Sequence, residues 1–403
     1  MAFKPDECAR ISDALAWLSA LGDEHRSDIG EPRVLHAVAT AGILLEFNPD
    51  ADCVIAGLLA RSAEEVSLIP ALRESFGPAV SALAEGAARM VTIEQLGGRV
   101  GQSPAAGAQL ESLRKMLLAM AQDMRVVLIK LADQVQSLRF AVKAGPSLER
   151  NAVARLAADI YAPLANRLGV WQLKWEIEDL SLRILDPEIY QRIARWLDEK
   201  RNDRENYIDD VIAQLRAALD EAGIAAEISG RPKHIYSIYN KMRNKELDFA
   251  SLYDVRAVRA IVADVKACYS VLGIAHNLWV PLPGEFDDYI ARPKGNNYRS
   301  LHTAVTGPGG KPLEIQIRTA EMHQHAEFGV AAHWRYKEGS NRDARYDDKI
   351  AWLRQVVEWK DEMANAGGLF ADTIYVLTPQ GRVIDLPADA TPIDFAYHLH
   401  SDL

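Results

Sequence analysis

The sequence predicts a multidomain chain in which an all-α N-terminal part is followed by an α+β part and by the start of a small β-rich unit. Apolar residues recur at helical spacing as far as about residue 185. From about residue 224 onward they form short runs rich in β-branched residues between turn residues. The chain has 403 residues, more than one hydrophobic core usually supports, and this length favours several domains.

Residues 1–185 are expected to form one helix after another. The runs Val34–Leu44 and Leu113–Val135 place apolar side chains three and four positions apart. Residues 186–223 keep the helical period but carry many charges, and the period is interrupted near Asn202–Asp203. We expect this segment to consist of helices that bridge two domains.

Residues 224–340 are expected to form the α+β domain, because strand patterns alternate there with helical ones. A connecting helix is expected in 341–368, and residues 369–403 begin a further β unit with a hairpin. Because the chain stops at Leu403, too soon to complete that unit, we expect it to be the N-terminal part of a longer protein. The predicted strands are Ala225–Ser229, Val255–Val262, Leu301–Thr306, Leu313–Ile317, Thr373–Leu377 and Arg382–Leu386, and the predicted helices are 234–245 and 264–279.

Composition narrows the class of protein. The formal net charge of −10 argues against a protein that coats nucleic acid nonspecifically, so a nucleotide site must be a local basic patch. Three widely spaced cysteines indicate neither a disulfide framework nor a thiolate zinc site. The longest apolar runs, such as Val54–Ala60, are far shorter than a bilayer span. We expect a cytoplasmic protein that does not enter a membrane.

Cationic residues concentrate between residues 231 and 245, where there are five Lys or Arg and no acid. Pro232 stands where the first turn of a helix would begin, and a helix N-terminus binds anions. Ser237 and Lys241 are four apart and share one face of that helix. With Arg231 and Lys233 from the preceding loop, the segment suits a polyphosphate. Taken alone, it also fits a solvated basic helix face.

The run Leu313–Arg318 alternates between apolar and polar residues. Glu314, Gln316 and Arg318 therefore share one face of a predicted strand. A carboxylate on a rigid strand beside cations is suited to holding Mg²⁺ or to taking a proton from a sugar hydroxyl. An ordinary strand with one wet face is the alternative.

A second acid, Asp254, precedes the strand that contains Arg259. Mg²⁺ prefers a few carboxylates together with substrate phosphates, so Asp254 and Glu314 would make a minimal metal site. Asp254 and Arg259 are an odd number of positions apart, so a regular strand points them to opposite faces. Both line one site only if Asp254 lies at the strand edge or at a bulge.

The loop from Pro293 to His302 supplies groups for a nucleotide base. Tyr298 offers a stacking surface, Lys294 offers charge and His302 offers a polar ring. A surface turn that leads into an ordinary strand is the alternative.

Together these segments resemble the synthetase domain of the RelA/SpoT homologue family, the stringent-response alarmone enzymes. The resemblance covers nearly the whole chain and is most specific over Gly230–Gly339. It implies an N-terminal HD-like domain, a nucleotidyltransferase-like α+β synthetase domain with a mixed sheet, and the beginning of a TGS domain. The matching motifs are GRPKHIYSIYNKM, DVRAVR, EFDDYIARPKGNNYRSLH, EIQIRT and EMHQHAEFGVAAHWRYKEG.

The resemblance implies a Mg²⁺-dependent transfer of pyrophosphate from ATP to the 3′-hydroxyl of GTP or GDP. It implies that Arg231 and Arg259 sandwich the adenine, and that Lys233, Ser237 and Lys241 hold the ATP phosphates. Asp254 would bind Mg²⁺, and Glu314 would share the metal or activate the 3′-hydroxyl. Tyr298 would stack on guanine, Lys294 and His302 would contact the acceptor phosphates, and Gln316 would position the ribose.

Two local features refine this resemblance. The family usually has Gly before the stacking Tyr, where this chain has Asn297, which tolerates a left-handed backbone. Glu285, Asp287 and Asp288 resemble the acidic signature of synthetase-only members, whereas bifunctional members carry a basic pair. Extra acids near a triphosphate predict a higher need for Mg²⁺. A solvated acidic loop is the alternative for this stretch.

The helical domain of the family is a metal-dependent hydrolase whose site needs a His, a His-Asp pair and a distant Asp. Here Glu31 stands in place of the first His, and Ala60-Arg61 replaces the pair, although Asp133 remains. Without imidazole ligands and with a cation in the site, we expect no metal binding and no hydrolysis. His36 is expected to cap or pack.

Two other classes of function remain open at this stage. One is a nucleotide-binding regulator whose TGS domain meets tRNA on the ribosome, and uncharged tRNA and the ribosome are the partners that the resemblance implies. The other is a ppGpp hydrolase, which the missing His-Asp pair opposes. The sequence leaves the oligomeric state and the choice between GDP and GTP open.

Overall fold

The computed structural model forms two compact units, Met1–Tyr161 with His333–Leu403 and Ala162–Ala332. The expected boundary near residue 185 lies inside the second unit. The residues that the structure describes are 3–97 apart from 23–25 and 28, 123–199, 201–231, 233–245, 256–294, 298–329, 373–377, 383–387, 390, 391 and 394.

The N-terminal segment of the first unit, Met1–Tyr161, is helical, as predicted, and is called the helical unit below. The helix α3 is its most buried element, and it begins where the Asp50 side chain accepts a hydrogen bond of 2.8 Å from the Cys53 N–H. The helix α4 is bent at Gly77, whose φ of +85° favours glycine, and Pro78 follows directly. The helices are α1 (Pro5–Ala20), α2 (Arg33–Leu45), α3 (Ala51–Leu59), α4 (Ile69–Gly97), α6 (Met124–Lys143) and α7 (Leu148–Leu156), with short turns at Ser62–Glu64, Val66–Leu68 and Ala157–Tyr161.

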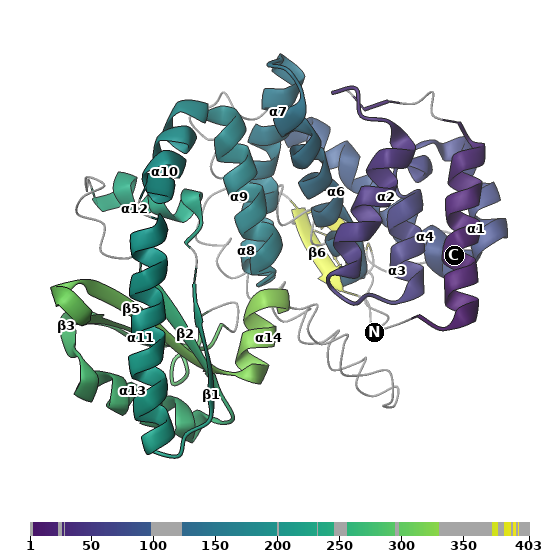
Figure 1. Cartoon of the computed structure of the whole chain (residues 1–403). Coiled ribbons are helices and arrows are strands. Elements are labelled where there is room, and N and C mark those ends of the chain that lie inside the picture. Colours follow the sequence, from purple (N-terminus) through teal and green to yellow (C-terminus); the bar gives the residue numbers. More distant parts are fainter. Residues whose placement is uncertain are drawn as a thin grey trace. The chain divides into compact units, whose positions relative to one another are not determined.

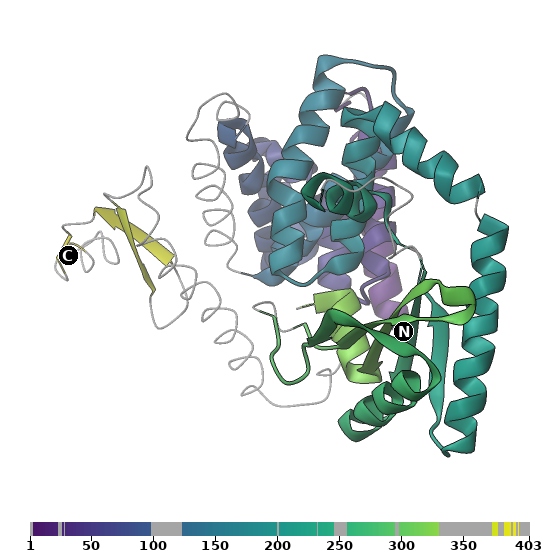
Figure 2. The same ribbon diagram turned by 90° about the vertical axis from the view of Figure 1, so that its left-hand side faces the viewer.

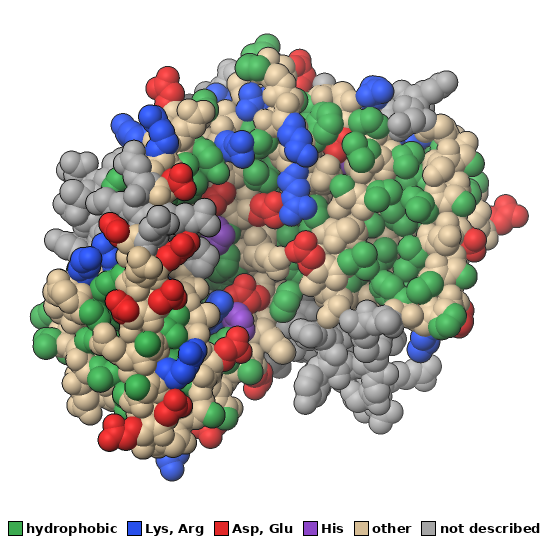
Figure 3. Space-filling model, in the orientation of Figure 1, with side chains coloured by type: hydrophobic (Ala, Val, Ile, Leu, Met, Phe, Trp, Pro, Cys, Tyr) green, Lys and Arg blue, Asp and Glu red, His purple; other side chains and the backbone are tan. Residues whose placement is uncertain are grey.

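Apolar side chains gather on the exposed surface of this unit over α2 (Figure 3). Leu35, Val38 and Leu45 are about half exposed, whereas Ile43 and Leu44 of the same helix are buried in the core. The helix is therefore apolar on both its inner and its outer side.

The second unit contains the bridging helices and the α+β domain. Its helices are α8 (Ala162–Arg167), α9 (Trp171–Leu185), α10 (Pro187–Glu199), α11 (Arg201–Glu221), α12 (Ile235–Lys245), α13 (Val265–Leu278) and α14 (Ala320–Phe328). The bridging segment is thus two helices, α10 and α11, that part within two residues of the predicted break. Within the described ranges, no helix combines the length and the apolarity that crossing a bilayer requires.

A five-stranded mixed sheet forms the centre of the α+β domain, and its strand order is β1-β2-β5-β4-β3. Only β2 and β5 run parallel among its neighbouring strands, and the other pairs are antiparallel. This confirms the expected mixed sheet. The strands are β1 (Ala226–Gly230), β2 (Ala257–Val262), β3 (Val280–Asp288), β4 (Leu301–Thr306) and β5 (Pro312–Thr319).

The edge strand β3 contains residues 285–288, which the sequence analysis did not predict as a strand and for which a solvated loop was the alternative. It is exposed along most of its length and contains Pro281 and Pro283. Prolines and charged residues are ordinarily signs against a strand, but an edge strand tolerates both, because one of its sides has no ladder to complete.

One face of the sheet packs against α11 and α13 (Figures 1 and 2). The apolar residues of β5 that were predicted to share a face, Leu313, Ile315 and Ile317, are fully buried there with Val211 of α11 and Val271 of α13. The opposite face of the sheet is polar, and α14 lies at that face, since its Glu327 contacts Arg259.

The C-terminal end of α14 approaches the turn before α9 very closely. Gly329 has a φ of +54°, and a Cβ at this position would collide with the backbone of Leu168 and Gly169. Only glycine permits this approach, which ties α14 to the start of α9.

The expected hairpin is present near the C-terminal end. The strand β6 (Thr373–Leu377) pairs antiparallel with β7 (Val383–Pro387). The helix expected in 341–368 lies outside the described residues.

Candidate active site

A row of aligned residues crosses all five strands of the sheet on its polar face. Asp287 pairs with His302, His302 with Gln316, Gln316 with Arg259, and Arg259 with Ser229. Directly paired residues point to the same face of a sheet. Side chains from distant segments of the sequence therefore converge here.

Glu314 lies on the same face, two residues before Gln316. Gln316 Nε2 donates to Glu314 Oε1 over 2.7 Å. The partners of Glu314 on the neighbouring strands are Ala257 and Ala304, and their small side chains leave room beside the carboxylate. Mg²⁺ takes one or two carboxylates and substrate phosphates, so Glu314 suits it as a donor.

The second expected metal ligand, Asp254, lies outside the described residues, as does Asn297. That Asp254 lies on the same face as Arg259, at the strand edge or at a bulge, therefore stays a prediction. Within the described ranges, no group of three or more His, Cys, Asp or Glu is arranged to hold a metal ion. The metal site at Asp254 and Glu314 therefore stays a prediction.

Tyr298 and His302 form the side of the site next to Glu314. The Tyr298 hydroxyl lies 2.8 Å from His302 Nε2, and His302 Nδ1 lies 3.6 Å from Glu314 Oε1. Burial, together with the nearby Arg231 and Lys294, lowers the pKa of His302 to about 3. His302 is therefore a neutral ring at neutral pH, and it contacts partners by hydrogen bonding.

Lys294 lies over two aromatic rings. Its Nζ is 4.2 Å from the centre of the Tyr289 ring and 5.5 Å from that of Tyr298. Burial lowers the pKa of Lys294, while Asp287 and Glu314 act in the opposite direction. The structure thus brings Lys294, Tyr298, His302, Gln316 and Glu314 together, as the sequence predicted.

Two further arginines reach the same face. The Arg231 N–H donates to Ala257 O over 2.8 Å, which extends the pairing of β1 and β2 and places Arg231 diagonally from Arg259. Glu327 Oε1 lies 3.2 Å from Arg259 Nη1 and 3.1 Å from Arg318 Nη2. One carboxylate therefore orients two guanidinium groups, and sequence reasoning missed it.

Arg318 also contacts His323. Its Nη2 lies 2.7 Å from His323 Nδ1. Burial lowers the pKa of His323 to about 4, with Arg318 and Arg259 acting in the same direction. A neutral His323 can accept this hydrogen bond. The four-residue spacing of His323 and Glu327 was the available signal, since it places both on one face of a helix.

Three buried polar atoms on this face have no hydrogen-bond partner within the described part of the chain. They are Gln316 Oε1, Arg259 Nε and Arg318 Nε. A buried polar group that stays unpaired costs about 1–3 kcal/mol. A polar ligand at this face would relieve that cost.

The basic segment departs from expectation at its helix N-terminus. The helix α12 begins at Ile235, three residues after Pro232, which lies outside the described residues. Asp179 Oδ1 accepts a hydrogen bond of 2.8 Å from the Tyr236 N–H, so an internal carboxylate occupies this end of the helix. Asp179 thus takes one N–H of the first turn, and the binding of a substrate anion at this helix end stays a prediction.

Three other predicted phosphate ligands lie on or next to α12. Ser237 and Lys241 are half-buried and one turn apart on α12, and Lys233 is half-buried in the loop before it. Their neighbour Ile238 is buried against Ile193 of α10, which holds this helix in place. Their role with phosphates stays a prediction.

The three acids of the acidic signature lie on β3 and have different surroundings. Glu285 is exposed, and Asp287 is paired with His302 in the aligned row. Asp288 Oδ1 accepts hydrogen bonds from the N–H groups of Ile290 and Ala291, so this acid stabilises the turn that follows.

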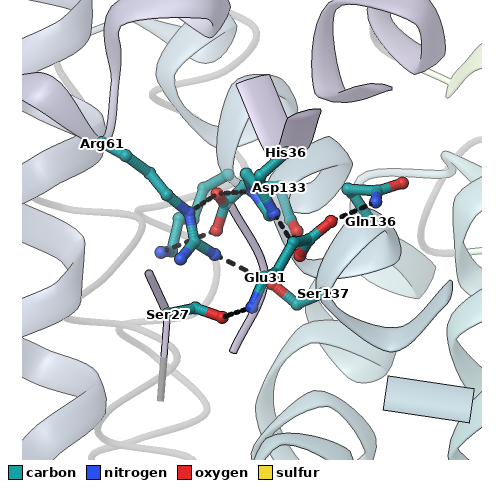
Figure 4. A network of polar contacts seen from close by, with 8 residues as sticks. Ser27, Glu31, His36, Arg61, Asp133, Gln136 and Ser137 are labelled. Carbon is teal, nitrogen blue, oxygen red and sulfur yellow. Dashed lines mark hydrogen bonds and ion pairs between the residues drawn. The ribbon is translucent and has the colours of Figure 1, made fainter. Parts of the chain in front are cut away.

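A second polar group is buried in the helical unit (Figure 4). His36 lies between two carboxylates, with Nδ1 2.8 Å from Glu31 Oε2 and Nε2 2.6 Å from Asp133 Oδ1. A neutral imidazole has a single N–H, so these two contacts favour the imidazolium form. Burial alone would lower the pKa of His36, but Asp133 and Glu31 outweigh it and the pKa is raised.

Two more cations contact Asp133. Arg61 Nε donates to Asp133 Oδ1 over 2.8 Å and Arg61 Nη2 to Ser137 Oγ over 2.9 Å, while Lys130 Nζ lies 3.1 Å from Asp133 Oδ2. Burial alone would raise the pKa of Asp133, but Arg61, Lys130 and His36 hold it well below its usual range. We call Glu31, His36, Arg61, Lys130 and Asp133 the buried ion cluster.

The buried ion cluster unites three of the four residues predicted as a degenerate hydrolase site. Ala60 is buried and has no polar side-chain atom to contribute. The sequence interpretation assigned His36 to capping or packing, and the ring is indeed buried, but its bridge between the two acids was not anticipated. Lys130 was not anticipated.

His36 makes the stability of the helical unit depend on pH. Its folded pKa is raised, so its contribution to the free energy of unfolding is complete below its unfolded value near 6.5 and is lost as the pH rises through the folded pKa. His302 and His323 are neutral in both states above that pH. We expect urea midpoints to fall as the pH rises above about 6.5, and less steeply in His36→Gln. Equal slopes in both proteins would contradict the expectation.

Comparison with known proteins finds three family models along the chain. The HD domain model matches residues 14–171, the model of the region found in RelA and SpoT proteins matches residues 230–341, and the TGS domain model matches residues 374–403. The three models thus match in the order HD domain, RelA and SpoT region, TGS domain. The order of domains that the resemblance implied is thereby confirmed.

The curated proteins that this chain resembles are longer than the chain. A GTP pyrophosphokinase of Escherichia coli K12 is 49% identical over 373 residues, which are 90% of this chain and 50% of that protein. A probable guanosine-3′,5′-bis(diphosphate) 3′-pyrophosphohydrolase of Synechocystis is 41% identical over 98% of this chain and 52% of that protein. The chain therefore spans about half the length of the curated relatives it matches.

One solved structure, small alarmone synthetase 1 of Bacillus subtilis bound to its product pppGpp, covers 43% of this chain and 96% of its own. It is 21% identical and has a TM-score of 0.29.

Proposed function

We propose that the chain is a GTP pyrophosphokinase of the synthetase-only type. It transfers the β,γ-pyrophosphate of ATP to the 3′-hydroxyl of GTP or GDP and releases AMP. The observation that carries this proposal is the aligned row on the polar face of the sheet, which brings Arg259, Gln316 and His302 together beside Glu314. A family relative of that name supports the same activity.

The acceptor nucleotide would bind on the β4 side of the site. Tyr298 would stack on guanine, and Lys294 and His302 would contact phosphates. Because His302 is neutral, it serves as a hydrogen-bonding group, and Lys294 supplies the charge. Gln316, which is fixed to Glu314, would position the ribose near the carboxylate.

The donor ATP would bind on the β2 side. Arg231 and Arg259 lie diagonally on one face, a spacing that suits two planar groups enclosing an adenine. Lys233, Ser237 and Lys241 would hold the phosphates. These residues act chiefly by positioning two anionic substrates and by neutralising charge that spreads during transfer.

Glu314 would take the proton of the 3′-hydroxyl, share in binding Mg²⁺, or do both. Asp254 is the second proposed ligand. Mg²⁺ would supply positive charge next to the transferred phosphates. The oxygen then attacks the β-phosphorus, the bond from that phosphorus to the bridging oxygen breaks, and AMP departs with that oxygen.

A labelled-nucleotide assay tests the proposal. The protein is incubated with labelled ATP, GTP or GDP and Mg²⁺, and the products are separated. A guanosine penta- or tetraphosphate with equimolar AMP is the expected result. A binding protein yields neither product, and that outcome would refute the proposal.

Tyr298→Ala is expected to raise KM for GTP about 10-fold or more, because loss of base stacking costs about 1–3 kcal/mol. The change in kcat should be smaller. Tyr298→Phe is the matched control, since it keeps the ring but removes the hydroxyl that meets His302. An unchanged KM in Tyr298→Ala would exclude guanine stacking at this residue.

The helical unit is proposed to lack hydrolase activity. The buried ion cluster supports this, since Arg61 and Lys130 occupy both oxygens of Asp133, the acid retained from the hydrolase pattern. The test is release of pyrophosphate from ppGpp with Mn²⁺. Release of pyrophosphate would favour a bifunctional enzyme.

The partners of the whole protein are part of the same proposal. The matched TGS domain supports contact with the ribosome and uncharged tRNA. The three cysteines, Cys8, Cys53 and Cys268, are free, which fits the cytoplasm, where such partners are found. Cosedimentation with ribosomes, with and without tRNA, tests this part separately from catalysis.

A further inference from the structure

The helix α9 carries three side chains that contact the candidate site from outside the sheet. Trp171, Trp175 and Asp179 are spaced four residues apart, so they follow one side of the helix. Trp175 and Asp179 lie between the two matched family regions, which end at residue 171 and begin at residue 230. No part of the function proposed above uses these residues.

The middle of α9 holds the donor side of the site. Trp175 is stacked on His234 with ring centres 4.7 Å apart and planes inclined by 20°. Arg231 Cζ lies 5.3 Å from the centre of the Trp175 ring, within cation–π distance. The indole therefore supports the guanidinium that is proposed to stack on adenine.

The Asp179 carboxylate contacts the same segment at one backbone N–H and at one side chain. Oδ1 accepts a hydrogen bond from the Tyr236 N–H, and Oδ2 lies 3.3 Å from His234 Nδ1. The segment from Arg231 to Tyr236 is thus connected to α9 at three of its residues. This segment has few ways to move independently of the helix.

The beginning of α9 holds the acceptor side. The Trp171 ring meets the Tyr298 ring edge to face, with centres 5.9 Å apart. Trp171 and Trp175 also contact each other, with centres 6.0 Å apart. Gly329 ties α14 to the turn before α9, and α14 orients Arg259 and Arg318. One rigid element thus touches groups on both sides of the site.

We infer that α9 positions the two nucleotide subsites, with Trp175 as a positioning residue for the donor and Trp171 as one for the acceptor. This rests on the proposed function. Transfer requires the two nucleotides to be aligned, and a misplacement of about 1 Å can cost about 100-fold in rate. A single helix that contacts Arg231 and Tyr298 fixes their separation.

The test separates the two substrates. In Trp175→Ala we expect KM for ATP to rise about 3- to 10-fold, the range of a cation–π contact, with KM for GTP changed less than about 2-fold. In Trp171→Ala the pattern should reverse. Trp175→Phe and Trp171→Phe keep an aromatic ring and should recover most of the loss.

The controls exclude a merely structural role. Loss of folded protein lowers the apparent kcat and leaves both KM values alone. Trp17→Ala, on α1 of the other unit, removes an indole whose ring meets Phe76 and should change neither KM. Equal rises in both KM values, or no change in either, would overturn the inference.

A binding measurement keeps this inference distinct from the proposed function. Calorimetry with an ATP analogue that has a methylene between the α- and β-phosphates needs no turnover. Trp175→Ala should weaken binding of the analogue about 3- to 10-fold, and Trp171→Ala should leave it unchanged. If the wild-type protein makes no product but the two variants differ in analogue binding as expected, the proposed reaction fails and the role of α9 stands. Equal binding by both variants would refute that role.

Discussion

Glu314→Gln is expected to lower kcat at least about 100-fold, because a positioned general base contributes about 10²–10⁴ in rate. The amide oxygen can still accept the hydrogen bond from Gln316 Nε2, so the local structure should persist. Steady-state rates at saturating ATP and GTP provide the measurement. Near-wild-type turnover would mean that the carboxylate is neither base nor metal ligand.

A matched control lies on the same sheet. Glu227→Gln makes the same exchange at an exposed position of β1, and it should leave kcat unchanged. A titration of Mg²⁺ then separates the two roles of Glu314. Recovery at high Mg²⁺ points to a metal ligand, whereas a constant deficit points to the base.

Asp133→Asn is expected to destabilise the helical unit by about 3–5 kcal/mol, the usual cost of removing one partner from a buried ion pair. His36, Arg61 and Lys130 would then face one another in the interior, with the charge of Glu31 alone to balance them. Urea unfolding followed by circular dichroism measures the change. A loss below about 1 kcal/mol, the range of exposed pairs, would contradict the expected burial effect.

Two further variants check the origin of this loss. Asp52→Asn breaks an exposed pair with Arg10 and should cost about 0–1 kcal/mol. Combining Asp133→Asn with Arg61→Met should cost less than the sum of the two single changes, because it also removes one of the cations left unpaired. Simple additivity would argue against direct coupling of Arg61 and Asp133.

Much of the site follows from local sequence patterns. The alternation in Leu313–Arg318 assigned Glu314 and Gln316 to one face of a strand, and the register of β5 agrees. The period of two residues suffices for this, because it needs no knowledge of the neighbouring strands. The helices α12 and α13 and four of the five strands were likewise predicted within two residues.

Other features depend on which elements become neighbours. His36 and Asp133 are 97 residues apart, and no periodicity in either segment indicates that they meet. Asp179 reaches the start of α12 from 57 residues away, and no local pattern indicates that its carboxylate bonds to this helix end. Trp171 and Trp175 fit the helical pattern of their own segment. That pattern does not indicate that their rings contact residues of distant loops.

The edge strand β3 bears on how this chain avoids joining other chains while it folds. An exposed strand edge offers unpaired N–H and C=O groups on which a second polypeptide can add. Pro281 and Pro283 have no N–H with which to extend a strand ladder, and Glu285, Asp287 and Asp288 add like charges that repel an identical copy. The prolines and acids that make the sequence of β3 look like a loop thereby also make the strand a poor template for aggregation.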